Sequence, residues 1–210
     1  MLEHLPNWLG RILEPVRAGA DKLAIAQPGL AGADHGEIAF RSPAFADHAR
    51  LPERFTADGV GISPPLAWGT LPTGTASLAL LVEDADAPTP QPLVHAIVWG
   101  LQPGTDGLAE GAIVADGDGT AGDVTADVGR NSFLREGWLP PDPPTGHGVH
   151  RYVFQLFALG PDAGDPGHSP GRGAMIEAMT GHVLAMGVFT GTYSREEVAP
   201  VGPAGEPLAV

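Results

Sequence analysis

The chain has 210 residues, enough for one domain with a sizeable core but few for two. Its 43% hydrophobic and 17% charged residues, with 30 glycines and 22 prolines, are typical of a folded, loop-rich protein built on sheets. Eleven Lys and Arg against 25 Asp and Glu give a formal net charge of −14, which repels phosphates and argues against a nucleic-acid partner.

Cysteine is absent, and no apolar run approaches the roughly 20 residues of a membrane span, so we expect a cytoplasmic protein without integral membrane association. The first 17 residues have apolar side chains at helical spacing, and we expect them to be retained as an amphipathic helix. An exposed apolar helix face needs cover from its own domain or from a second subunit, which makes a homodimer a reasonable expectation.

The next elements in chain order are strands. Helix and linker would occupy residues 1–36, the main domain 37–195, and a flexible tail 196–210. Short runs bounded by Gly or Pro predict strands at 37–40, 77–83, 93–100, 151–160 and 187–193. One interior segment, 174–186, has a helical pattern, and residues 102–130 form a long acidic loop. Many strands and few helices predict a mainly β fold.

Polar side chains gather at the ends of three of these strands. Asp84 and Asp86 follow the strand at 77–83, and Pro88 fixes the exit from it. His95 interrupts an otherwise apolar run, so its ring needs an internal partner or a cavity. A Pro-rich turn leads into His150 and Tyr152, which alternation places on one side of a strand with Arg151 on the other. Each feature alone is typical of ordinary core or turn residues, and we assign His147 to that structural class.

The order of these motifs resembles the phosphatidylethanolamine-binding protein family, in particular its bacterial Raf-kinase-inhibitor-like branch, the YbhB/YbcL-like proteins. The resemblance rests on ISPPLAW (62–68), VEDADAP (82–88), VHAIVW (94–99) and the GHGVHRY stretch (146–152), and it extends over residues 37–195. It implies a β-sandwich of two sheets with a few peripheral helices, including a C-terminal helix, to which this chain adds an N-terminal helix.

The resemblance also implies a small anion pocket at one end of the sandwich. Carried over by motif, its lining is Asp84, Asp86, Pro88, His95, His150 and Tyr152. The family pattern further implies a cis peptide bond between Ala87 and Pro88. This chain departs from the branch at 139–144, where Leu-Pro-Pro-Asp-Pro-Pro replaces a stretch that usually begins Gly-Gly and contains a cysteine. Asp142 therefore adds a carboxylate at the mouth of the pocket.

We therefore expect a binding protein without a cofactor or metal, not an enzyme. Its ligand would be a small phosphorylated or other anionic molecule, such as phosphate or phosphoethanolamine, whose ammonium group could meet Asp84 or Asp86. Binding would strengthen as histidine protonates below pH ~6.5. The resemblance adds a partner kinase or protease that the protein modulates. The alternative is a metal-dependent or acid/base hydrolase that uses the same His and Asp side chains.

Overall fold

The structure is a computed structural model that describes residues 13, 15–31, 35–115, 120–121 and 124–195. Its main element is a six-stranded sheet in the order β1-β11-β10-β4-β5-β9. All neighbouring strands are antiparallel except β1, which runs parallel to β11. The strands are β1 (Gly36–Glu37), β4 (Ser77–Asp84), β5 (Leu93–Leu101), β9 (Asp127–Val128), β10 (His150–Leu159) and β11 (Val183–Tyr193).

Two smaller sheets and short helices complete the fold. A three-stranded antiparallel sheet has the order β2-β3-β6, and β7 and β8 form a hairpin. The helices are one α-helix and three 3-10 turns. Their bounds are β2 (Phe40–Arg41), β3 (Leu66–Trp68), β6 (Gly107–Leu108), β7 (Thr120–Ala121), β8 (Val124–Thr125), α2 (Arg172–Met179), η1 (Ala20–Lys22), η2 (Ala24–Ala26) and η3 (Glu53–Phe55).

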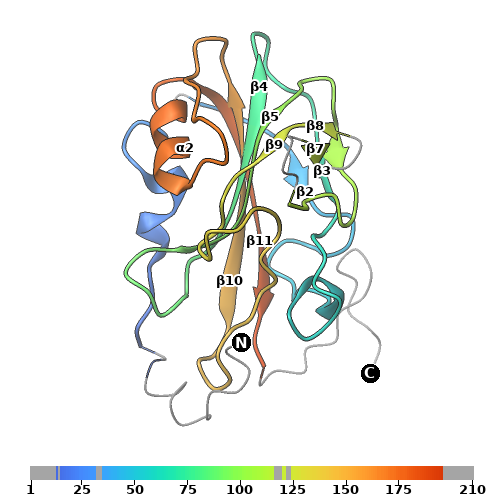
Figure 1. Ribbon diagram of the computed structural model, residues 1–210, viewed down its shortest axis with the longest axis vertical. Helices are drawn as coiled ribbons and strands as arrows, with labels where there is room; N and C mark the ends of the chain where they lie inside the picture. The colour runs from blue at the N-terminus through green and yellow to red at the C-terminus, as the bar shows by residue number, and fades with distance from the viewer. Residues whose placement is uncertain (1–12, 14, 32–34, 116–119, 122–123, 196–210) are drawn as a thin grey trace.

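The large sheet is covered on both faces, as Figure 1 shows. The three-stranded sheet lies on one face and encloses the larger core, to which β4 contributes Leu78, Leu80 and Val82. The N-terminal segment and α2 lie on the other face, where Met175 and Met179 pack against the alternate residues of β4. Because both faces are buried, β4 and β10 are apolar along almost their whole length, which explains their unbroken hydrophobic runs.

The mainly β, two-sheet fold and the five predicted strands are confirmed, but the predicted helix at 174–186 is too long. The α-helix ends at Met179, and Gly181, with φ of 80°, turns the chain into β11. Residues from Val183 onward pair with β10 instead. An apolar run bounded by glycine fits either period, so the sheet partner decides its structure. The predicted amphipathic helix lies almost wholly outside the described residues, and the predicted C-terminal tail lies entirely outside them.

Candidate ligand-binding site

The candidate site lies where β4 ends and where β5 and β10 begin. The register places Tyr152 of β10 opposite Asp84 of β4, and Asp84 opposite Leu93 of β5. A cavity of ≈ 550 Å³ opens at this end of the sheet. Five of the six residues predicted for the pocket line it: Asp84, Pro88, His95, His150 and Tyr152.

His95 reaches this cavity because β5 contains a β-bulge. Val82 pairs with Ala96 and Glu83 pairs with Val94, so His95 has no partner on β4. An extra residue of this kind bends the strand and re-aims its side chain. The segment 131–139 then takes the other side of β5, where the Leu139 amide donates to the His95 carbonyl and Nδ1 of His95 lies 2.6 Å from the Leu139 carbonyl oxygen.

Two buried polar atoms of the cavity lining have no hydrogen-bond partner in the protein, Nε2 of His95 and the hydroxyl of Tyr152. The rings meet edge to face with centroids 5.0 Å apart. Burial lowers the pKa of His95, against the opposing effect of Asp84, and so keeps its ring neutral. Burial, reinforced by Asp84, raises the pKa of Tyr152, which keeps its hydroxyl as a donor. Buried polar groups without partners are rare in folded proteins, and at a cavity they indicate a bound molecule.

His150 lines the cavity, but both of its ring nitrogens already have partners. Nδ1 lies 2.7 Å from Oδ2 of Asp84, and Nε2 lies 2.7 Å from Nδ1 of His147. Nε2 of His147 in turn lies 2.7 Å from the carbonyl oxygen of Leu13. His147 is thus a fully buried structural residue, as expected, that links the site to the N-terminal segment.

Asp86 does not line the cavity, contrary to the sequence prediction. β4 ends at Asp84, so the alternation that would have kept both carboxylates on one side does not continue. Arg151 binds Asp86 through Nε and Nη2, at 2.7 and 2.8 Å, and Nη1 of Arg17 lies 2.9 Å from it. Burial would raise the pKa of Asp86, but these hydrogen bonds outweigh it and the pKa is lowered. As predicted, Arg151 points away from His150 and Tyr152.

The loop after β4 also differs in its peptide geometry. The described residues contain no cis peptide bond, so the Ala87–Pro88 bond is trans and the cis expectation is wrong. The trans form is the favoured isomer of X–Pro bonds in folded proteins. In this loop, the carbonyls of Ala85 and Ala87 accept hydrogen bonds from the amides of Gly19 and Ala18.

Asp142 lines the mouth of the cavity, where Arg195 compensates its charge. Nη2 of Arg195 lies 2.6 Å from Asp142 and 2.8 Å from Asp58. The Tyr193 hydroxyl donates to Asp58 at 2.8 Å. Arg195 lies 53 residues after Asp142, so sequence reasoning had no signal for this pairing.

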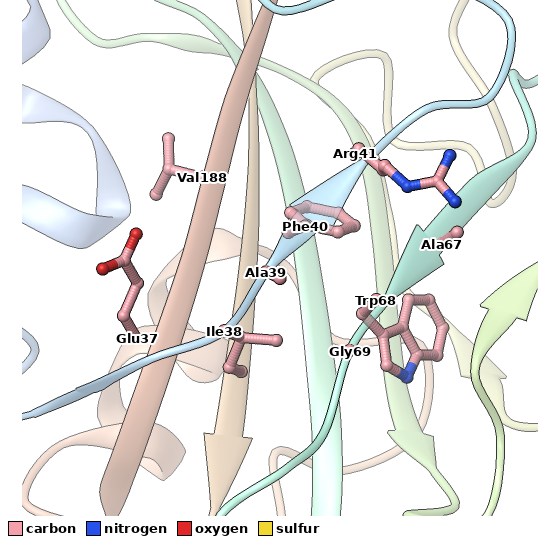
Figure 2. A pocket seen from close by; sticks show the side chains of 9 residues that line it. All are labelled: Glu37, Ile38, Ala39, Phe40, Arg41, Ala67, Trp68, Gly69 and Val188. Atoms are coloured by element: carbon pink, nitrogen blue, oxygen red, sulfur yellow. The ribbon is translucent and has the colours of Figure 1, made fainter.

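A second cavity, of ≈ 440 Å³, lies beside β2 and β3 and contains none of the predicted site residues. Figure 2 shows Glu37 and Arg41 on opposite sides of it. It is lined by Glu37, Ile38, Ala39, Phe40, Arg41, Ala67, Trp68, Gly69 and Val188. Within the described part of the chain, no group of three or more His, Asp or Glu side chains is arranged to hold a metal ion.

The family model named "Phosphatidylethanolamine-binding protein" matches residues 41–194. The fold and this match define the class of protein, and the chain belongs to the phosphatidylethanolamine-binding protein family. Within it, the chain falls in the bacterial YbcL-like branch. Escherichia coli YbcL superposes with a TM-score of 0.68 at 29% identity, covering 77% of this chain and 100% of YbcL.

Other relatives place the chain in the same branch. A homologue of the family from Chlamydia trachomatis superposes with a TM-score of 0.67 at 33% identity, over 77% of this chain and 99% of its own. A UPF0098 protein of Pyrococcus horikoshii is 36% identical over 151 residues, 70% of this chain and 71% of that protein. LppC of Mycobacterium tuberculosis, 36% identical over 68% of this chain and 67% of its own, is called a lipoprotein. No helix in the described ranges has the length and hydropathy of a membrane span.

Proposed function

We propose that the cavity binds small molecules that carry a phosphoryl group, and that the protein acts as a binding protein for them. The observation that carries this proposal is the pair of unpartnered buried atoms, His95 Nε2 and the Tyr152 hydroxyl, in the lining of a cavity of ≈ 550 Å³. A hydroxyl that stays protonated can donate to a phosphoryl oxygen, and hydrogen bonds to charged groups are worth about 1.5–3 kcal/mol each.

The acidic side chains near the cavity are less hostile to an anion than the sequence indicates. Asp86 is outside the lining and is bound by Arg151 and Arg17. Asp142 is bound by Arg195. Arg135 and Glu136 both line the mouth, where they offer each sign of charge to a zwitterion such as phosphoethanolamine. The ammonium group would therefore lie at the mouth and not beside Asp86.

Binding is a better use of these side chains than hydrolysis. An acid/base pair needs a histidine nitrogen that faces the substrate and is tuned by a carboxylate. His150, which has the carboxylate, has no nitrogen left for a substrate. His95 faces the cavity but takes its hydrogen bond from a main-chain carbonyl. Modulation of a kinase or protease, a homodimer and a cytoplasmic location stay predictions.

The test is a calorimetric titration of phosphoethanolamine into the wild type and Tyr152→Phe at pH 5.5 and 8. We expect saturable binding that is stronger at pH 5.5 and about 10- to 100-fold weaker in Tyr152→Phe, because the variant loses a hydrogen bond to a charged group. Ser194→Ala is the matched control, since it removes another unpartnered buried hydroxyl that does not line the cavity. Absence of binding to the folded wild type at both pH values would refute the proposal.

A further inference from the structure

The network behind the cavity holds more protons than its residues would carry separately. Asp84, His150, His147 and the Leu13 carbonyl are joined by three contacts, each 2.7 Å long. Each contact needs one hydrogen between its two heavy atoms. An ionised carboxylate and two neutral imidazoles supply only two N–H hydrogens, and a carbonyl supplies none. The network therefore carries a third proton, and its net charge is zero.

That extra proton belongs to the contact between Asp84 and His150. The Leu13 carbonyl can only accept, so Nε2 of His147 carries a hydrogen. Burial, with His150 next to it, lowers the pKa of His147 and disfavours a second proton on that ring. Oδ1 of Asp84 accepts from the Asp86 amide, which leaves the Oδ2 side for the shared proton. Asp84 therefore presents no uncompensated charge to an anion in the cavity.

His95 presents a lone pair to the cavity and not a hydrogen. The Leu139 carbonyl fixes the hydrogen on Nδ1, so Nε2 of the neutral ring is an acceptor. The groups packed around this ring are Asp84 on β4, His150 and Tyr152 on β10, and Asp142 at the mouth. With the proton shared between Asp84 and His150, and with Asp142 bound by Arg195, none of these groups supplies a hydrogen to Nε2.

We infer that the cavity selects phosphomonoesters that bring their own proton, with a P–OH donating to Nε2 of His95 and a phosphoryl oxygen accepting from the Tyr152 hydroxyl. This inference rests on the proposed function and names its ligand class. A phosphomonoester loses its second proton with a pKa near 6 and can bind as the protonated monoanion. A phosphodiester has no P–OH, so its oxygens would face the lone pair of His95.

Two measurable consequences follow. Above pH ~6, binding of a monoester takes up about one proton, and the affinity falls as pH rises because the monoanion becomes scarce. Between pH 5.5 and 7.5 the fraction of monoanion drops by about 20-fold, and the affinity should drop with it. A diester of similar size should bind about tenfold or more weakly, because it leaves a buried acceptor unpaired against an anion.

The experiment uses methyl phosphate and dimethyl phosphate, which differ by one methyl group. Each is titrated calorimetrically into the full chain at pH 5.5, 6.5 and 7.5, in two buffers of different ionisation enthalpy, so that the proton count is measured directly. Phosphoethanolamine is titrated in parallel. In His95→Gln the amide can rotate to offer an N–H, and both the ester preference and the proton uptake should shrink. His182→Gln, which does not line the cavity, is the matched control.

The outcomes separate the two claims. Proton uptake near one at pH 7.5 together with a preference for methyl phosphate supports this inference. Binding of methyl phosphate without proton uptake, or equal affinity for both esters, overturns it and leaves the proposed function standing. No binding of methyl phosphate or phosphoethanolamine at any pH overturns both. The wild-type titrations decide among these results even if His95→Gln does not fold.

Discussion

Asp86 has a buried carboxylate whose role is to hold the loop after β4 in place. Three donors of Arg151, its main-chain amide, Nε and Nη2, meet this one side chain. Bidentate pairs between arginine and carboxylate are among the strongest polar contacts in proteins. The DxD pattern therefore contains two different functions, one carboxylate in the cavity network and one that binds arginines behind it.

At the residue scale, Asp86→Asn should change how stability depends on pH. The pKa of Asp86 is lowered in the folded protein, so its contribution is present above the unfolded value of about 3.9 and is lost as pH falls below it. Denaturant unfolding of wild type between pH 7 and 3 should therefore show a steeper acid loss than Asp86→Asn. Parallel curves for the two proteins would show that the arginines do not stabilise the ionised carboxylate. Asp165→Asn, in an exposed turn, is the control.

At the scale of elements, the N-terminal segment is a structural part of the site although it precedes the family match. Arg17 donates to the carbonyls of His147 and Val149, at 3.1 and 2.9 Å, and also contacts Asp86. It thus joins the turn before β10 to the loop after β4. Leu13 supplies the carbonyl that ends the histidine network. These contacts come from outside the matched residues 41–194 and distinguish this chain from a minimal family domain.

Arg17→Met should therefore weaken ligand binding without touching the ligand. The variant leaves two carbonyls and part of Asp86 without their donor, so both loops should open more readily, and we expect a loss of about 1–3 kcal/mol in unfolding free energy. Hydrogen exchange at the Ala18 and Gly19 amides should accelerate, since these bond the same loop. Lys22→Met, from the same segment but on the Pro90 carbonyl, is the control. Unchanged exchange and affinity would mean that the segment only rests on the domain.

At the scale of the whole molecule, the net charge of −14 opposes the approach of any anion. The site overcomes this locally, by pairing its carboxylates with Arg195 and histidine rather than by surrounding the ligand with cations. Local neutralisation acts only at contact distance, whereas the repulsion extends over a Debye length of about 30 Å at 0.01 M salt and about 8 Å at 0.15 M.

Added salt should therefore speed association of an anionic ligand, the reverse of what a cationic binding site shows. Between 10 and 150 mM of a weakly coordinating salt, we expect the association rate of methyl phosphate to rise a few-fold, roughly the effect of screening the long-range repulsion. Stopped-flow measurement at constant pH gives this rate. Phosphoethanolamine, whose ammonium offsets one charge, should respond less. A rate that falls with salt would indicate a local cationic surface at the mouth.

The sequence by itself determined the mainly β class, the five long strands and the membership of the family, because burial on both sheet faces and motif order are written in consecutive residues. It also placed Tyr152 and His150 opposite Arg151, since alternation within one strand is a local property. Only the tertiary structure decided that β4 ends at Asp84, that a bulge turns His95 to the cavity, and that Arg17, Leu13 and Arg195 complete the site. These features depend on the pairing of distant segments, for which a single sequence has no periodic signal.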